Sequence, residues 1–173
     1  MLFSYPEAQS LRGRLAAADS APAASINRIE HGRRVIPLSR GHHVRGWHPV
    51  RPDHGAVPFE SKLECCVLTA LVAFAEFTSV QSQPVTVFYK HDGRRVRYTP
   101  DFRASFSSVP LELAAFGFAR ETLIEVKPLW RALRHETKLR RQFAVLRVAT
   151  ACPIVLVTEC DLPRMRQEIR HGY

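Results

Sequence analysis

The sequence predicts an α/β fold in which helices flank a mixed β-sheet. Two runs rich in β-branched and aromatic residues lie on either side of His91-Asp92-Gly93, and this arrangement indicates a β-hairpin. A short strand, an amphipathic helix and a second strand follow, an order typical of a crossover between parallel strands. The run from Pro153 to Thr158 is continuously apolar, as in a strand buried on both faces.

The N-terminal part, residues 1–40, is predicted to form a basic, partly irregular extension, and residues 41–173 the main domain. Ser10 to Ala18 carries apolar residues at helical spacing, which predicts one short helix. Residues 19–25 are rich in Ala, Ser and Pro, a composition typical of a linker. Gly and Pro are frequent between residues 41 and 58, so turns and extended segments are expected there.

The clearest helix is predicted over Phe59 to Phe77, because apolar residues recur there every three or four positions. Val85 to Tyr89 and Arg95 to Phe102 are predicted as the strands of the hairpin. Residues 103–120 stay ambiguous, since a proline and a glycine interrupt an apolar stretch. The remaining predicted elements are a strand over Leu123 to Lys127, a helix over Arg134 to Ala149, the strand over Pro153 to Thr158 and a terminal helix over Leu162 to Ile169.

Charge is the most informative bulk property of this chain of 173 residues. It has 25 Lys and Arg against 16 Asp and Glu, a net charge of +9, and a pI near 10.0. Such basicity indicates a polyanionic partner, usually nucleic acid. The longest apolar run, Cys65 to Ala75, is far too short to cross a bilayer. No secretory signal is recognisable at the N-terminus, so we expect a cytoplasmic protein without a membrane partner.

Cysteine and histidine do not predict a metal site. None of the four cysteines belongs to a C-x-x-C pair. His42, His43, His48 and His54 are close in sequence, but their spacing does not complete a ligand set of the kind that binds zinc.

Acidic residues and one lysine carry the candidate chemistry. Glu125 and Lys127 are two positions apart on a predicted strand, so they share a face, while Ile124 and Val126 point to the core. With Asp101 nearby, these groups suit metal-assisted phosphodiester hydrolysis, in which oxygen ligands hold Mg²⁺ and a lysine stabilises the developing charge. The alternative is a solvated Glu–Lys pair on an edge strand.

A third acid is expected from the long helix, where Glu60 and Glu64 share a face. Glu64 adjoins the apolar stripe, where a carboxylate is costly to bury unless it binds a cation or hydrogen-bond donors. Glu60 is nearer the helix N-terminus, where an acid also favours the helix dipole. That other explanation for Glu60 favours Glu64 as the functional acid, with Glu60 as the alternative.

Four motifs in order resemble the TnsA-type endonucleases of heteromeric transposons, within the PD-(D/E)-x-K superfamily, and the strand that follows them also fits. The motifs are E-S-K-L-E at 60–64, S-Q-P-V at 82–85, Y-T-P-D-F at 98–102 and I-E-V-K-P at 124–128, and the strand is P-I-V-L-V-T-E at 153–159. The resemblance covers about residues 55–162. It implies a restriction-endonuclease-like core within the α/β fold.

The resemblance also implies a Mg²⁺-dependent DNA endonuclease, with Mn²⁺ as a substitute metal. Glu64, Asp101, Glu125 and Lys127 match the catalytic positions of the family. Asp101, Glu125, the backbone carbonyl of Val126 and Glu64 are the implied metal ligands. Such enzymes cleave the 5′ ends of a transposon during cut-and-paste DNA transposition. The implied partners are double-stranded transposon-end DNA, a DDE transposase subunit and an AAA+ regulator ATPase.

Two other functions stay open at this point. The chain is then either a stand-alone defence or repair nuclease with the same core, or a catalytically inactive DNA-binding subunit.

Two further residues near the motifs have expected roles. Gln83 is expected either to fix the start of the first hairpin strand or to support the active site from behind, and Tyr98 is expected to pack.

Arginines near the predicted site are candidates for phosphate contacts. They are Arg94, Arg95 and Arg97 in the hairpin, with Arg131 and Arg134 after the catalytic strand. The alternative for all of them is a solvated basic face.

Overall fold

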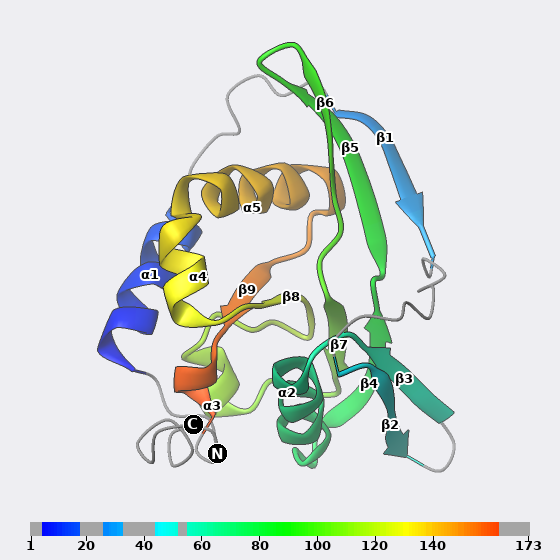
Figure 1. Ribbon diagram of the computed structural model, residues 1–173. Helices are drawn as coiled ribbons and strands as arrows, with labels where there is room; N and C mark the ends of the chain where they lie inside the picture. The colour runs from blue at the N-terminus through cyan, green and yellow to red at the C-terminus, as the bar shows by residue number, and fades with distance from the viewer. Residues whose placement is uncertain (1–4, 18–25, 33–43, 52–54, 163–173) are drawn as a thin grey trace.

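A computed structural model describes residues 5–17, 26–32, 44–51 and 55–162 of the chain (Figure 1). The predicted linker at 19–25 and residues 163–169 of the predicted terminal helix lie outside the described residues. The helices are α1 (Pro6–Ala16), α2 (Lys62–Val72), α3 (Leu111–Ala114), α4 (Leu129–Arg134), α5 (Glu136–Thr150) and the 3₁₀ turn η1 (Glu159–Asp161). The strands are β1 (Ile26–His31), β2 (Gly46–Arg51), β3 (Gly55–Phe59), β4 (Phe77–Ser82), β5 (Val85–His91), β6 (Arg94–Tyr98), β7 (Phe102–Phe106), β8 (Glu121–Val126) and β9 (Ile154–Val157).

The predicted α/β fold is confirmed, although its strands form three sheets instead of one. The central sheet is mixed, with the order β4-β7-β8-β9. β4, β7 and β8 are antiparallel neighbours, whereas β8 and β9 are parallel and joined through α4 and α5. A second antiparallel sheet has the order β1-β5-β6, and β2 and β3 form a separate hairpin.

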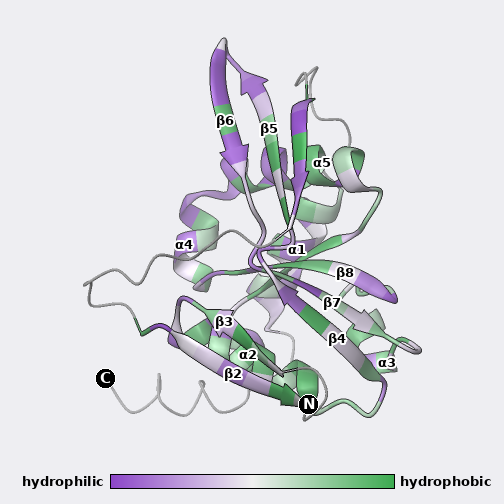
Figure 2. Cartoon of the chain, turned by 90° about the vertical axis from the view of Figure 1, so that its right-hand side faces the viewer, coloured by the Kyte–Doolittle hydropathy of each residue, from purple (hydrophilic) through white to green (hydrophobic). Residues whose placement is uncertain are grey.

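Helices cover both faces of the central sheet, and each face has its own hydrophobic cluster (Figures 1 and 2). α2, α3 and the β2–β3 hairpin cover one face, and α1, α4 and α5 cover the other. Strand alternation divides β8 between them: Ile124 and Val126 join the first cluster, and Leu123 joins the second. Both faces of β8 are therefore buried. The apolar sequence of β9 predicts the same burial on both faces for that strand.

A β-bulge interrupts the long hairpin that β4 and β5 form with β6 and β7. Val87 pairs with Tyr98 and Ser82 pairs with Phe102, so residues 83–86 lie opposite residues 99–101. One extra residue is therefore accommodated at Gln83, which has a positive φ of 47°. The prediction of one strand over Arg95 to Phe102 is wrong, because Pro100 has no N–H for a ladder and the chain bends there.

The boundaries of the two long helices also differ from the prediction. α2 begins after Ser61, whose hydroxyl caps it, and ends at Val72. Phe77 already belongs to β4, a strand that the helical prediction over Phe59 to Phe77 concealed. The predicted helix over Arg134 to Ala149 is α5, and it follows α4 across His135, whose ψ of 22° is not helical.

The described parts of residues 1–40 are more regular than predicted. α1 packs against α5 and β9, and the Arg12 guanidinium pairs at 2.9 Å with the buried carboxylate of Asp161. β1 pairs with β5 along its length. The predicted domain boundary at residue 40 stays a prediction, but these two elements pack on the same body as the rest of the chain. No helix in the described residues is long and apolar enough to cross a membrane.

Candidate active site

Asp101 lies at the bulge, where the hairpin passes from the outer sheet to the central one. Its Oδ2 accepts a hydrogen bond of 2.7 Å from the backbone N–H of Val126, on the neighbouring strand β8. Its backbone carbonyl accepts a bond of 2.8 Å from the N–H of Gln83. The bulge and β8 therefore fix both the main chain and the carboxylate of Asp101.

Glu125 and Lys127 lie side by side at the end of β8, as predicted. Glu125 Oε1 accepts a bond of 2.6 Å from Lys127 Nζ, and its Oε2 accepts one of 2.7 Å from the Tyr98 hydroxyl. The residue is only 5% exposed, because β8 lies between β7 and β9. The alternative of a solvated pair on an edge strand is therefore wrong.

The end of β8 is held in place beyond the two functional side chains. The N–H of Lys127 donates to the carbonyl of Val157 on β9 at 3.1 Å. Glu159 accepts a bond of 2.8 Å from the N–H of Leu129, in the first turn of α4. These bonds fix the chain direction just where Lys127 leaves the sheet.

Glu64 takes part in the N-terminal cap of α2. Its Oε2 accepts a bond of 2.8 Å from the N–H of Glu60, and its Oε1 accepts one of 2.8 Å from the Ser61 hydroxyl. The Glu64 N–H in turn donates to Ser61 Oγ at 3.1 Å, so the Ser61 hydroxyl caps the helix and Glu64 bonds back to the residues just before it. The sequence argument that only Glu60 has a structural explanation was wrong: Glu64 has one too.

Glu60 precedes the helix and contacts the bulge instead. Gln83 Nε2 donates to Glu60 Oε1 at 2.8 Å, and the Arg45 guanidinium lies 4.0 Å from Glu60 Oε2. Gln83 thus joins the start of α2 to the backbone of Asp101. Gln83 therefore contacts a residue that lines the first cavity, and the choice between a role at the strand start and a role in support of the site stays a prediction.

Two adjoining cavities contain the predicted residues. The first, of about 360 Å³, is lined by Arg45, Glu60, Ser61, Leu63, Glu64, Asp101, Val126, Lys127, Pro128 and Arg131. The second, of about 320 Å³, is lined by Tyr98, Glu125, Lys127, Arg131, His135, Lys138, Leu139 and Gln142. Lys127 and Arg131 line both. The fold therefore brings Glu64, Asp101 and Lys127 to one cavity and places Glu125 in the next, against Lys127.

The carboxylates are held in an environment that opposes their charge. Burial, followed by repulsion from Glu125 and Glu64, raises the pKa of Asp101 well above its ordinary range. Burial also raises the pKa of Glu64, and the nearby charges of Glu60 and Glu125 raise it further. Burial and the charge of Glu125 raise the pKa of Tyr98 well above 10, so its hydroxyl stays a donor. A cation relieves this repulsion.

The donor set fits a hard divalent cation. Asp101 and Glu64 share a cavity, carry only oxygen donors and repel each other, which is the chemistry that Mg²⁺ requires. In the described residues, no three Asp, Glu, His or Cys side chains already surround one point. Asp101, Glu64, Glu125 and the carbonyl of Val126 would hold the ion.

Sequence reasoning missed Tyr98, Arg45 and Ser61 as parts of the site. The sequence contains a signal for Tyr98, because it precedes Thr99-Pro100-Asp101 on the strand that leads to the bulge. Its hydroxyl was expected only to pack, yet it is a donor to Glu125. Nothing in the sequence marks Arg45, which reaches the cavity from the start of the β2–β3 hairpin.

Removing the Tyr98 hydroxyl should destabilise the protein. Tyr98→Phe leaves the buried Glu125 with one donor fewer, and a hydrogen bond to a charged group is worth about 1.5–3 kcal/mol. Chemical denaturation should show a loss of this size. Tyr89→Phe is the matched control, because the Tyr89 hydroxyl is equally buried but has no hydrogen-bond partner among the described residues. Equal effects of both substitutions would contradict a specific role for the Tyr98–Glu125 bond.

Comparison with known proteins assigns no family to this chain. No protein-family model matches it, and no curated protein matches its sequence. The chemistry of the two cavities is therefore the basis for assigning a function.

Proposed function

We propose that the protein is a metal-dependent DNA endonuclease. The observation that carries this proposal is the cavity at the end of β8, which the half-buried carboxylates of Asp101 and Glu64 line together with Lys127. Mutually repelling oxygen donors beside a lysine are the groups that phosphodiester hydrolysis uses. The net charge of +9 suits a polyanionic substrate.

Each side chain has a distinct task in this proposal. Asp101, Glu64, Glu125 and the Val126 carbonyl bind the cation, which when bound polarises the scissile phosphate and lowers the pKa of a water. Lys127 stabilises negative charge on the phosphate oxygens, and its bond to Glu125 fixes the position of its ammonium group. Arg131 lines both cavities and is positioned to contact a neighbouring phosphate.

The motif resemblance extends this proposal to DNA transposition. A TnsA-type endonuclease cleaves the 5′ ends of a transposon and acts with a DDE transposase and an AAA+ regulator. Three of the four motifs supply residues of the two cavities: residues 60–64, 98–102 and 124–128. We propose the same partners here, and the cytoplasm as the place where they meet.

A nicking assay tests the proposal. Supercoiled plasmid should be nicked with Mg²⁺ or Mn²⁺ and left intact in EDTA, with the transposase supplied if the protein alone is silent. Nicking without any partner would favour a stand-alone defence or repair nuclease. A protein that binds DNA but never nicks, with or without the transposase, would overturn the proposal in favour of an inactive DNA-binding subunit.

Two isosteric substitutions distinguish Glu64 from Glu60. Glu64→Gln should lower cleavage by orders of magnitude, because it removes a ligand charge. Melting without metal should change little, because the amide oxygen can still accept a hydrogen bond from the Glu60 N–H or the Ser61 hydroxyl. Glu60→Gln should leave cleavage nearly intact and cost a few tenths of a kcal/mol, since its ion pair with Arg45 is long and partly exposed. Loss of nicking in Glu60→Gln with retention in Glu64→Gln would reverse the assignment.

A further inference from the structure

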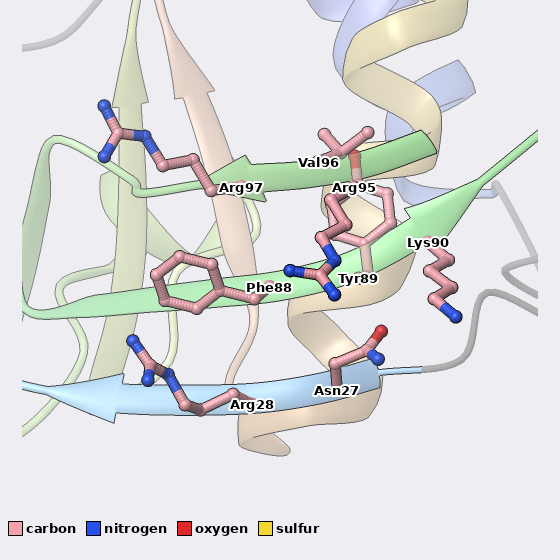
Figure 3. Close-up of a pocket in the computed structure, with 8 residues that line it drawn as sticks. All are labelled: Asn27, Arg28, Phe88, Tyr89, Lys90, Arg95, Val96 and Arg97. Atoms are coloured by element: carbon pink, nitrogen blue, oxygen red, sulfur yellow. The ribbon is translucent and has the colours of Figure 1, made fainter. Parts of the chain in front are cut away.

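The outer face of the three-stranded sheet carries a basic surface that is separate from the two cavities. Strand alternation turns Val87 and Tyr89 toward the second hydrophobic cluster and leaves Phe88 on the outside. We call this outer side the basic sheet face and define it by Arg28 of β1, Phe88 and Lys90 of β5, and Arg95 and Arg97 of β6. Figure 3 shows Phe88 on the middle strand, between Arg28 and Arg97.

The charge on this face is almost entirely positive. Arg28 pairs with Glu30, two residues along the same strand. Among the described residues, no carboxylate pairs with Lys90, Arg95 or Arg97, and all three are exposed. A group of unneutralised cations on a stable sheet requires an anionic partner or solvent, and it attracts polyanions over distances of about a Debye length.

The face is also hollow. A depression of about 760 Å³ lies over Asn27, Arg28, Phe88 and Arg95, and a second of about 400 Å³ lies over Glu30, Thr86 and Thr99. Phe88 and Arg97 line both depressions, so the two adjoin each other. The opposite side of the sheet packs on α5, so the strands that carry the basic sheet face are held in place by the hydrophobic core.

We propose that the basic sheet face binds the sugar–phosphate backbone of duplex DNA that flanks the cleaved phosphate. This inference rests on the proposed endonuclease function and adds where the substrate is held. Arginine suits the role, because its planar guanidinium matches phosphate oxygens.

β6 connects the basic sheet face to the candidate active site. Arg97 is on the basic sheet face, its neighbour Tyr98 turns inward to Glu125, and Asp101 follows at the bulge. Asp101 is four positions after Arg97, a span of at most about 14 Å between their Cα atoms. With one phosphate per about 3.4 Å along each strand of duplex, the basic sheet face would contact DNA within about four base pairs of the cleaved bond.

The position of Phe88 favours duplex over single-stranded DNA. Single-strand binding surfaces offer free aromatic rings on which bases stack. Here the guanidinium of Arg28 lies 4.8 Å from the centre of the Phe88 ring and covers it. The ring therefore orients a cation toward the ligand, which is a contact for phosphate rather than for a base.

A binding experiment with matched variants tests this surface. Binding of a labelled duplex of random sequence is measured by fluorescence anisotropy in EDTA, over a series of salt concentrations. Arg95→Ala/Arg97→Ala removes two phosphate contacts, each worth about 0.9 in the slope of log K against log salt. We expect the slope to become shallower by about 1.8 and the affinity at about 0.1 M salt to fall on the order of 60-fold.

Two further variants make the result decisive. Arg120→Ala/Arg140→Ala removes the same charge from two exposed arginines elsewhere, one just before β8 and one on α5, and should keep the wild-type slope. Arg95→Lys/Arg97→Lys should retain most of the slope, because lysine also contacts phosphate. Melting temperatures verify that all variants fold. Equal losses in both alanine pairs, no loss in either, or a loss seen only with single-stranded DNA would overturn the proposal.

The two proposals fail in different ways. If the wild-type protein binds duplex through this face but never nicks plasmid, the endonuclease function fails and the binding surface stands. If nicking occurs while Arg95→Ala/Arg97→Ala binds and cleaves like wild type, the surface proposal fails and the endonuclease proposal stands.

Discussion

Asp101→Asn should abolish Mg²⁺-dependent nicking and raise the melting temperature of the metal-free protein. The substitution removes one charge from a cluster of buried and half-buried carboxylates, where Glu125 and Glu64 repel Asp101. The amide oxygen can still accept the bond from the Val126 N–H, so the fold is kept. The loss of activity and the gain in stability have one cause, which is that the carboxylate is arranged to bind a cation.

The gain in melting temperature of metal-free Asp101→Asn over wild type should depend on pH. Because the pKa of Asp101 is raised in the folded protein, its contribution to stability is fully present below the ordinary value of 3.8 and is lost as pH rises through the raised pKa. The melting temperature of metal-free Asp101→Asn should therefore exceed that of wild type by a margin that grows as pH rises from about 4 into the neutral range. Calorimetry in EDTA measures this margin.

Asp92→Asn is the matched control for Asp101→Asn. Asp92 lies in the hairpin turn with an exposed side chain and a positive φ of 46°, which asparagine also adopts readily. It should change neither nicking nor the pH dependence. Wild-type nicking by Asp101→Asn in the presence of Mg²⁺ would show that the site is wrongly assigned.

Lys127→Met should lower nicking by about 10²- to 10³-fold, the effect of removing a preorganised group that stabilises developing charge. It also leaves the buried Glu125 with the Tyr98 hydroxyl as its remaining side-chain donor among the described residues. The metal-free protein should therefore lose about 1–3 kcal/mol of stability. Nicking kinetics and denaturation in EDTA measure the two effects.

Metal binding separates the role of Lys127 from that of Asp101. Lys127 is not a ligand, so Mn²⁺ should still raise the melting temperature of Lys127→Met, whereas it should do so much less for Asp101→Asn. Lys127→Arg keeps the charge but replaces a compact ammonium with a wide planar fork, and should restore only part of the nicking. Full nicking by Lys127→Met would remove this lysine from the proposed chemistry.

The parts of the fold that could be predicted are those with strong local patterns. Asp92-Gly93 predicts a hairpin turn, and the apolar run of β9 predicts a strand buried on both faces. β4 was hidden because its Phe77 and Val80 continue the apolar spacing of α2, and nothing in the chain marks the end of that helix with Gly or Pro. β1 was missed because its alternation is weak and β5 supplies its partner.

The acids and the lysine of the candidate site were predictable from the sequence, but its other lining residues and its contacts were not. The two-residue spacing of Glu125 and Lys127 on a strand was sufficient to place them on one face. Their burial was not predictable, because it depends on β9 lying beside β8. The bond between the Tyr98 hydroxyl and Glu125 arises from two segments that are far apart in sequence, and no local pattern encodes it.

The bulged hairpin has a consequence for genetics. Its outer half packs in one hydrophobic cluster, through Tyr89 and Tyr98, and its inner half packs in the other, through Phe102 and Phe106. Asp101 lies at the border, so its position depends on two separately packed cores. A screen for alleles that lose cleavage but still accumulate as folded protein should therefore recover substitutions in both cores, at sites that touch neither DNA nor metal.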